Sequence, residues 1–274
     1  MATILKGNTG MEQKINKTKK QLNIYQKLQG KEKLINIIVD VFVTVISFLL
    51  LYIVHPALGL IGGGIGYAVS YYVIDKTLIV SWINSKVRDR YFYLEYLMNK
   101  QNGENLINKT LTDNMNKDFY LINGARFETE DNNVIRIPHV MLCPDGTIVC
   151  IESHNLKGTF SMGNKDWRRK LQTDNGQYIY ENDFMDMRTK SYKSARNLHL
   201  MFGKKLKKHK IVSLVVMANK ESNWEGKQES FCPIIRLNQL SRFLNHHYGQ
   251  KQLEKEENER SAMMLWSKTI SKAS

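Results

Sequence analysis

Cysteine is scarce in this chain, and its pattern excludes two common kinds of small stabilised fold. Three cysteines, Cys143, Cys150 and Cys232, occur among 274 residues, each in an apolar stretch. Their spacing does not match a zinc site, and an odd number does not suggest a disulfide framework. We therefore expect buried thiols in a reducing cytoplasm.

Negative charge is also in short supply. The chain has 26 acidic residues against 40 lysines and arginines, which gives a net charge of +14. Such a balance favours a polyanionic partner, either nucleic acid or an anionic membrane surface. A composition that is simply rich in lysine and asparagine is the alternative. The length suffices for one sizeable domain with additional segments.

The sequence predicts no secretory signal peptide, because no small-residue cleavage site closes the first apolar run. Residues 1–33 are polar and rich in lysine, and they predict a basic cytoplasmic arm. Residues 34–54 are almost wholly apolar, with Asp40 as their one charge. About 20 apolar residues suffice for a helix to span the hydrocarbon core of a bilayer. The run therefore predicts a membrane helix.

A second apolar run follows the helix break at His55-Pro56 and extends to Trp82. It contains small residues at four-residue spacing, which allow two helices to approach closely: Gly59, Gly62, Gly63 and Gly66. We therefore expect a two-helix transmembrane hairpin over residues 34–82. A buried apolar hairpin in a soluble protein is the alternative.

Basic residues flank this apolar region on both sides and predict its topology. Lys27, Lys31 and Lys33 precede it, and Lys76, Lys86, Arg88 and Arg90 follow it. The positive-inside rule then predicts a multi-pass protein of the cell membrane with both termini cytoplasmic. Residues 83–101 predict a juxtamembrane helix, and residues 246–274 predict a charged C-terminal tail.

Two strands joined by a turn form the centre of the remaining sequence. Residues 135–155 read IRIPHVMLCPDGTIVCIESHN, in which the Pro-Asp-Gly sequence at 144–146 predicts the turn. Side chains alternate along a strand, so Glu152 and His154 share one face. A carboxylate and a second polar group thus leave an apolar strand side by side, as in a site at a sheet edge.

Helix and strand patterns alternate through residues 102–245. A helix, three strands, a second helix over 182–203, an apolar strand over 211–218, and a terminal strand and helix follow one another. This order predicts an α/β domain with a mixed central sheet that is flanked by helices.

The motifs Ile137-Pro138-His139 and Ile151-Glu152-Ser153-His154-Asn155 resemble the nuclease-related domain (NERD) of the PD-(D/E)XK superfamily. Members of that family typically read Ile-Asp-His and Ile-Glu-x-Lys-Asn. The resemblance implies a restriction-endonuclease-like fold over residues 102–245. It also implies that an Asp and a Glu hold Mg²⁺ or Mn²⁺ while a Lys positions the nucleophile.

The chain departs from this pattern at both catalytic partners of Glu152. Pro138 stands in place of the metal-binding Asp, and His154 stands in place of the Lys. Glu104 matches a family glutamate that helps complete the site, although an acidic residue near a helix N-terminus has the same appearance. Glu152, His154 and Glu104 are therefore the catalytic candidates. Glu152 is the candidate metal ligand, and a degenerate site would hold no metal.

Three basic clusters are candidates for binding nucleic acid. They comprise Lys165, Arg168, Arg169 and Lys170; Arg188, Lys190, Lys193 and Arg196; and Lys204, Lys205, Lys207, Lys208 and Lys210. Arg188, Tyr192 and Arg196 recur at intervals of four and predict one face of a helix. Such clusters neutralise phosphates, contact anionic headgroups, or simply form a solvated surface.

Three hypotheses follow for function. In the first, a membrane-anchored nuclease-related domain with a degenerate site binds nucleic acid or a partner protein. In the second, the same domain is a metal-dependent DNA nuclease with a rearranged site. In the third, the protein is an oligomeric membrane scaffold whose glycines drive association into a homo-oligomer or a membrane complex.

Overall fold

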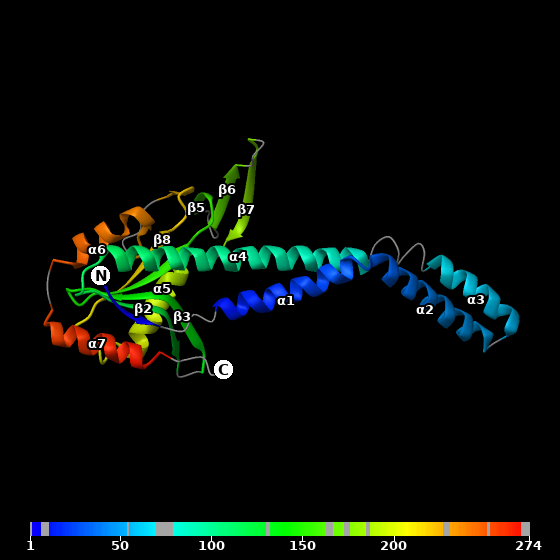
Figure 1. Ribbon diagram of the computed structural model, residues 1–274, viewed down its shortest axis with the longest axis horizontal. Coiled ribbons are helices and arrows are strands. Elements are labelled where there is room, and N and C mark those ends of the chain that lie inside the picture. The colour runs from blue at the N-terminus through cyan, green and yellow to red at the C-terminus, as the bar shows by residue number, and fades with distance from the viewer. Residues whose placement is uncertain are drawn as a thin grey trace. The chain divides into compact units, whose positions relative to one another are not determined.

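A computed structural model describes residues 2–6, 11–53, 55–69, 79–129, 132–162, 167–172, 176–184, 187–226, 231–250 and 253–269. The chain divides into two compact units (Figure 1). One unit comprises Met1–Met11 and Met98–Ser274, and the other comprises Glu12–Leu97.

The unit Glu12–Leu97 is helical. It contains nearly all of α1 (Met11–Gln29), together with α2 (Glu32–Tyr52), α3 (Pro56–Val69) and the first part of α4 (Ile79–Asn114). Helices α2 and α3 pack tightly, since a Cβ atom added to Gly66 would lie 2.6 Å from the Ser47 side chain. Gly66 thus serves packing within the helix pair, and a homo-oligomer stays a prediction.

Membrane crossing is where the structure departs from the sequence-based prediction. Helix α3 has 14 residues, about 21 Å at 1.5 Å per residue, which is shorter than the roughly 30 Å hydrocarbon core. Helix α2 includes the charged residues Glu32, Lys33 and Asp40. Within the described ranges, no helix is both long and apolar enough to cross a membrane. This finding contradicts the transmembrane hairpin over 34–82 and the multi-pass membrane localisation; residues 70–78 of that segment lie outside the described ranges.

Helix α4 runs without a break through 36 residues, whereas the sequence predicted a juxtamembrane helix and a separate helix from residue 102. Gly103 therefore lies inside a helix, where glycine costs about 0.5–1 kcal/mol relative to alanine. A Cβ atom at Gly103 would lie 2.8 Å from the Cβ atom of Asn155. The glycine thus allows α4 to approach the segment that follows the central strand.

The predicted mixed sheet flanked by helices is present. Its six strands have the order β1-β2-β3-β4-β8-β10. They span β1 (Thr3–Lys6), β2 (Tyr120–Glu128), β3 (Val134–Leu142), β4 (Ile148–His154), β8 (Ile211–Met217) and β10 (Ile234–Arg236). The pairs β2–β3 and β3–β4 are antiparallel, and the other three pairs are parallel.

Helices cover both faces of this sheet (Figure 1). Helices α5 (Met187–Phe202) and α7 (Lys255–Ser267) share one core with Phe127, Ile137 and Cys150. Helix α6 (Leu240–Tyr248) follows β10 through η2 (Leu237–Gln239). Helices α4 and α6 share another core with Val149 and Leu214. Full burial of each such side chain contributes about 1.5–3 kcal/mol.

A second sheet of four strands has the order β7-β6-β5-β9. Its strands are β5 (Gly158–Met162), β6 (Trp167–Gln172), β7 (Tyr178–Phe184) and β9 (Ser222–Glu225). Residues 182–184, which the sequence assigned to a helix, belong to β7 because Phe184 pairs with Trp167. The rings of Trp167 and Trp224 lie 4.5 Å apart and join this sheet to the core.

Both ends of the chain contribute to the fold. Strand β1 extends the large sheet beside β2, with Thr3 paired to Tyr120. Ala262 and Leu265 of α7 are fully buried. Composition alone had suggested a polar arm and a charged tail, because the four residues of β1 and the sparse apolar positions of α7 give a weak periodic signal.

Candidate functional site at the end of strand β4

Strand β4 ends where the sheet opens on one side. Its pairing with β3 extends as far as His139 opposite Ile151, whereas its pairing with β8 continues to His154 opposite Met217. The next residue of β3 is Pro138, which has no N–H group to donate to a further ladder bond. Glu152 therefore lies where β3 and β4 separate.

Two lysines from opposite faces of the sheet neutralise Glu152. The carboxylate is buried, and the Lys190 ammonium on α5 donates a hydrogen bond to its Oε1 atom. The Lys100 ammonium on α4 lies 3.8 Å from the same oxygen. A buried carboxylate requires such partners, because an unpaired buried charge is costly.

The environment of Lys100 makes its charge adjustable. Burial lowers the pKa of Lys100 from 10.5 to about 8; Glu152 opposes this shift, and Lys190 and Arg136 add to it. Lys100 is therefore mostly protonated at pH 7 and mostly neutral at pH 9.

A second buried carboxylate lies at the same end of the sheet. Glu104, one helical turn after Lys100 on α4, accepts two hydrogen bonds from Arg136 of β3, at 2.9 and 2.6 Å. This fork geometry fixes both side chains. The structure thus brings Glu104 and Glu152 to the same end of the sheet, where each carboxylate already has a cationic partner.

The two histidines of the motifs are neutral, so neither supplies the positive charge of the motif lysine. Burial lowers the pKa of His154 to about 3, and Arg169 and Lys190 act in the same direction. Its ring packs edge-on against Phe160, with the centroids 4.5 Å apart. Burial likewise lowers the pKa of His139 to about 3. His139 Nδ1 donates to Asn123 Oδ1 at 2.8 Å, so His139 is a hydrogen-bonded sheet residue.

The predicted basic residues fall into three settings. The exposed set comprises Arg168, Lys193, Arg196, Lys204, Lys205, Lys207, Lys208 and Lys210. Arg169 and Lys170 are half-buried on β6. Arg188 is only 3% exposed and lies over the rings of Trp167 and Trp224, at 5.7 and 5.1 Å from their centroids. Lys165 lies outside the described residues.

Sequence reasoning missed three members of the site. Lys190 was placed in a basic cluster rather than beside Glu152, and Lys100 and Arg136 were not considered. The spacing of Lys100 and Glu104, four residues apart on one helix face, was an available signal. The contacts of Arg136 and Lys190 depend on tertiary packing, which no local pattern reveals.

The residues present do not fit Mg²⁺ or Mn²⁺. These ions require several carboxylate, carbonyl or water oxygens around one point. Glu104 and Glu152 are both paired with cationic side chains. In the part of the chain that the structure describes, no group of three or more His, Cys, Asp or Glu residues is arranged to hold a metal ion.

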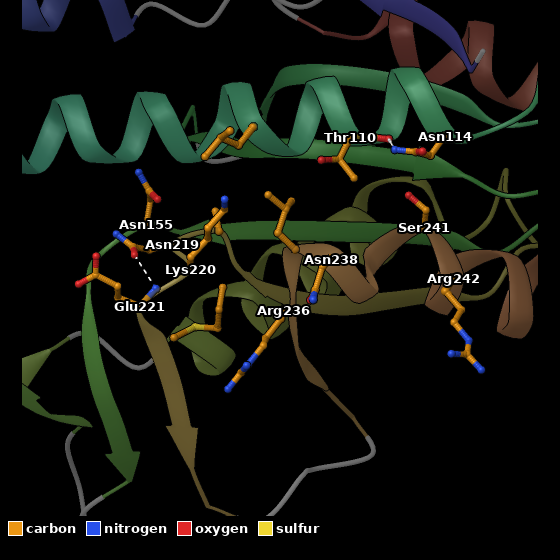
Figure 2. Close-up of a pocket in the computed structure, with 14 residues that line it drawn as sticks. Thr110, Asn114, Asn155, Asn219, Lys220, Glu221, Arg236, Asn238, Ser241 and Arg242 are labelled. Carbon is orange, nitrogen blue, oxygen red and sulfur yellow. Dashed lines mark hydrogen bonds between the residues drawn. The ribbon is translucent and has the colours of Figure 1, made fainter.

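A pocket of about 940 Å³ lies beside this site, at the carboxyl ends of β8 and β10. Figure 2 shows Thr110 and Asn114 of α4 on one side and Ser241 and Arg242 of α6 on the other. Asn155 follows His154 in the chain and lines the pocket, and its amide donates to the Asn99 carbonyl of α4 at 3.0 Å. The pocket therefore offers amide, hydroxyl and guanidinium groups in a single concavity.

Comparison with known proteins supports the resemblance. The model of the nuclease-related domain (NERD) matches residues 99–218, a range that includes the paired carboxylates and their three cations. No curated protein and no solved structure matches the chain. The similarity to a nuclease-related domain is therefore confirmed over this range.

Proposed function

We propose that this nuclease-related domain binds the phosphate backbone of nucleic acid with the cations around Glu104 and Glu152, and that this binding requires no divalent metal. The pairing of both carboxylates with cationic side chains is the observation that carries the proposal. With Lys100 protonated, three cations face two carboxylates, so the site carries a net charge of +1. A site of this sign attracts an anion.

The cations of the site are accessible in part. The side chains of Lys190, Arg136 and Lys100 are 31%, 21% and 17% exposed, whereas those of Glu152 and Glu104 are 4% and 8% exposed. The positive groups therefore lie outside the negative groups they neutralise. A phosphate that approaches this end of the sheet meets ammonium and guanidinium groups first.

Two positions that supply metal-dependent chemistry in the family motif are replaced in this chain, which supports the same proposal. Pro138 has no ligand atom where the family motif has Asp. His154 is neutral and packs against Phe160 rather than replacing the motif lysine. The exposed lysines and arginines of α5 and the following loop extend the positive surface and would contact further phosphates, so binding should weaken steeply with salt.

Fluorescence anisotropy of the full chain with a labelled DNA oligonucleotide tests the proposal. We expect binding in EDTA that MgCl₂ does not strengthen and that falls by at least tenfold between 50 and 200 mM salt. Lys190→Met should weaken binding more than Lys109→Met, which removes the same charge from an exposed position on α4. Absence of binding in EDTA, or equal effects of the two variants, would refute the proposal.

A metal-dependent nuclease is the second candidate, and one observation favours it. Lys190 places an ammonium on Glu152 from α5, which would compensate for the missing motif lysine at position 154. Incubation of the protein with supercoiled plasmid and Mg²⁺ or Mn²⁺ separates the two candidates. Cleavage that Glu152→Gln abolishes and Glu257→Gln preserves would establish the nuclease. If the protein only binds, Glu152→Gln should retain or tighten DNA binding, because it removes a negative charge.

A further inference from the structure

The β6–β7 hairpin exposes two tyrosines on one face. Tyr178 and Tyr180 of β7 are 53% and 64% exposed. They are two residues apart on a strand, so their side chains point to the same face, about 6.6 Å apart along it. Strand β7 is the outermost strand in the order β7-β6-β5-β9, which leaves this face at the margin of the sheet.

A cation accompanies the two rings. Lys170 of β6 pairs directly opposite Tyr180, and its Nζ atom lies 4.1 Å from the centroid of the Tyr178 ring. The ammonium can cover one face of that ring, and a ring has two. Arg168 is exposed on the same strand. Two aromatic rings and the Lys170 ammonium therefore lie together on this face.

We propose that this face, formed by Tyr178, Tyr180 and Lys170, stacks unpaired bases and makes single-stranded nucleic acid the preferred ligand of the domain. The inference rests on the proposed function, which it deepens by naming the class of nucleic acid. Bases within a duplex are already stacked on their neighbours, whereas unpaired bases present free ring faces to aromatic side chains. Neighbouring cations then neutralise the backbone phosphates.

The charge of the hairpin favours this occupant over an apolar protein segment. An apolar partner would have to desolvate Lys170, which a buried interface penalises. A single strand uses both features, since its bases contact the rings and its phosphates contact the ammonium. Stacking on two tyrosines also tolerates any base sequence, because every base has a π face.

The test compares a labelled 15-nucleotide single strand with the matching duplex by fluorescence anisotropy, using the full chain. We expect Tyr178→Leu/Tyr180→Leu to weaken single-strand binding at least tenfold and duplex binding less than twofold. Tyr178→Phe/Tyr180→Phe keeps both rings and should change neither affinity by more than twofold. Tyr91→Leu, at a comparably exposed tyrosine of α4, should also have no effect.

The outcomes separate this inference from the proposed function. Equal weakening of both ligands by the leucine pair, or no weakening of either, overturns the inference while metal-independent binding stands. A wild-type chain that binds neither ligand overturns both proposals. If the leucine pair does not fold, Tyr180→Leu alone is the second variant, with an expected loss of at least threefold for the single strand only.

Discussion

The end of strand β4 and the β6–β7 hairpin both carry cations, but in opposite settings. At the end of β4, Lys100, Arg136 and Lys190 lie against buried carboxylates. On the hairpin, Lys170 lies beside an exposed tyrosine. The cations at the end of β4 stabilise the fold because they neutralise buried carboxylates, whereas Lys170 beside an exposed ring contributes little stability.

Removal of Glu152 should have the largest effect on stability. Glu152→Ala leaves Lys190 and Lys100 near each other without their shared counter-charge, so we expect the free energy of unfolding to fall by about 3 kcal/mol. Urea denaturation measures this change. Glu257→Ala is the matched control, because its partner Lys208 is exposed on the surface. A loss at Glu257 as large as that at Glu152 would contradict the distinction between the two settings.

The pair formed by Glu104 and Arg136 gives the next largest effect. Glu104→Gln should lower the free energy of unfolding by about 2–3 kcal/mol, because it leaves the half-buried guanidinium without its charged partner. The double variant Glu104→Leu/Arg136→Met removes both charges and should be more stable than either single variant. Losses that simply add in the double variant would show that the two side chains do not act as a pair.

These pairs also show what the sequence can and cannot predict. The apolar runs and the Pro-Asp-Gly turn predicted the two strands β3 and β4, because they are local patterns. The mixed sheet with helices on both faces is also present as predicted. The partners of the carboxylates were not predicted, because Lys100 and Lys190 reach Glu152 from helices on opposite faces of the sheet.

In the apolar region, a local pattern gave a wrong prediction. A local property, the run of apolar residues over 34–54, predicted a membrane span, whereas the helices of the described residues do not meet the requirements of length and apolarity.

The helix face that contains Arg188 differs from its prediction for another reason. Spacing of four residues predicted a common face for Arg188, Tyr192 and Arg196, but the packing of Trp167 and Trp224 draws Arg188 inward.

Arg188 and Lys193 lie five residues apart on α5, one buried and one exposed, and their removal should have smaller effects. Arg188→Met removes a buried cation–π contact and should lower the free energy of unfolding by about 1–2 kcal/mol, with no change in the salt dependence of DNA binding. Lys193→Met should leave stability unchanged and reduce the slope of log K against log salt by about 1. Urea denaturation and anisotropy at several salt concentrations measure both. The reverse pattern would place Arg188 in the interface.

Lys100 gives the smallest expected effect, because it belongs to both sides of the comparison. Its pKa of about 8 predicts that the wild-type site loses about 0.8 of a positive charge between pH 7 and pH 9. The slope of log K against log salt for single-stranded DNA should therefore be about 0.6 smaller in magnitude at pH 9. Lys100→Arg should abolish this pH dependence, because a guanidinium stays protonated at both values.

Unfolding at pH 9 does not explain the expected weakening of DNA binding. Because the pKa of Lys100 is lower in the folded chain than its ordinary value of 10.5, the unfolded chain binds more protons between pH 8 and 10.5. This group therefore makes the fold more stable as pH rises through that window. If urea denaturation shows that stability does not fall between pH 7 and pH 9, a fall in affinity comes from the charge of the site. An equal slope at pH 7 and pH 9 would mean that Lys100 does not face the phosphates.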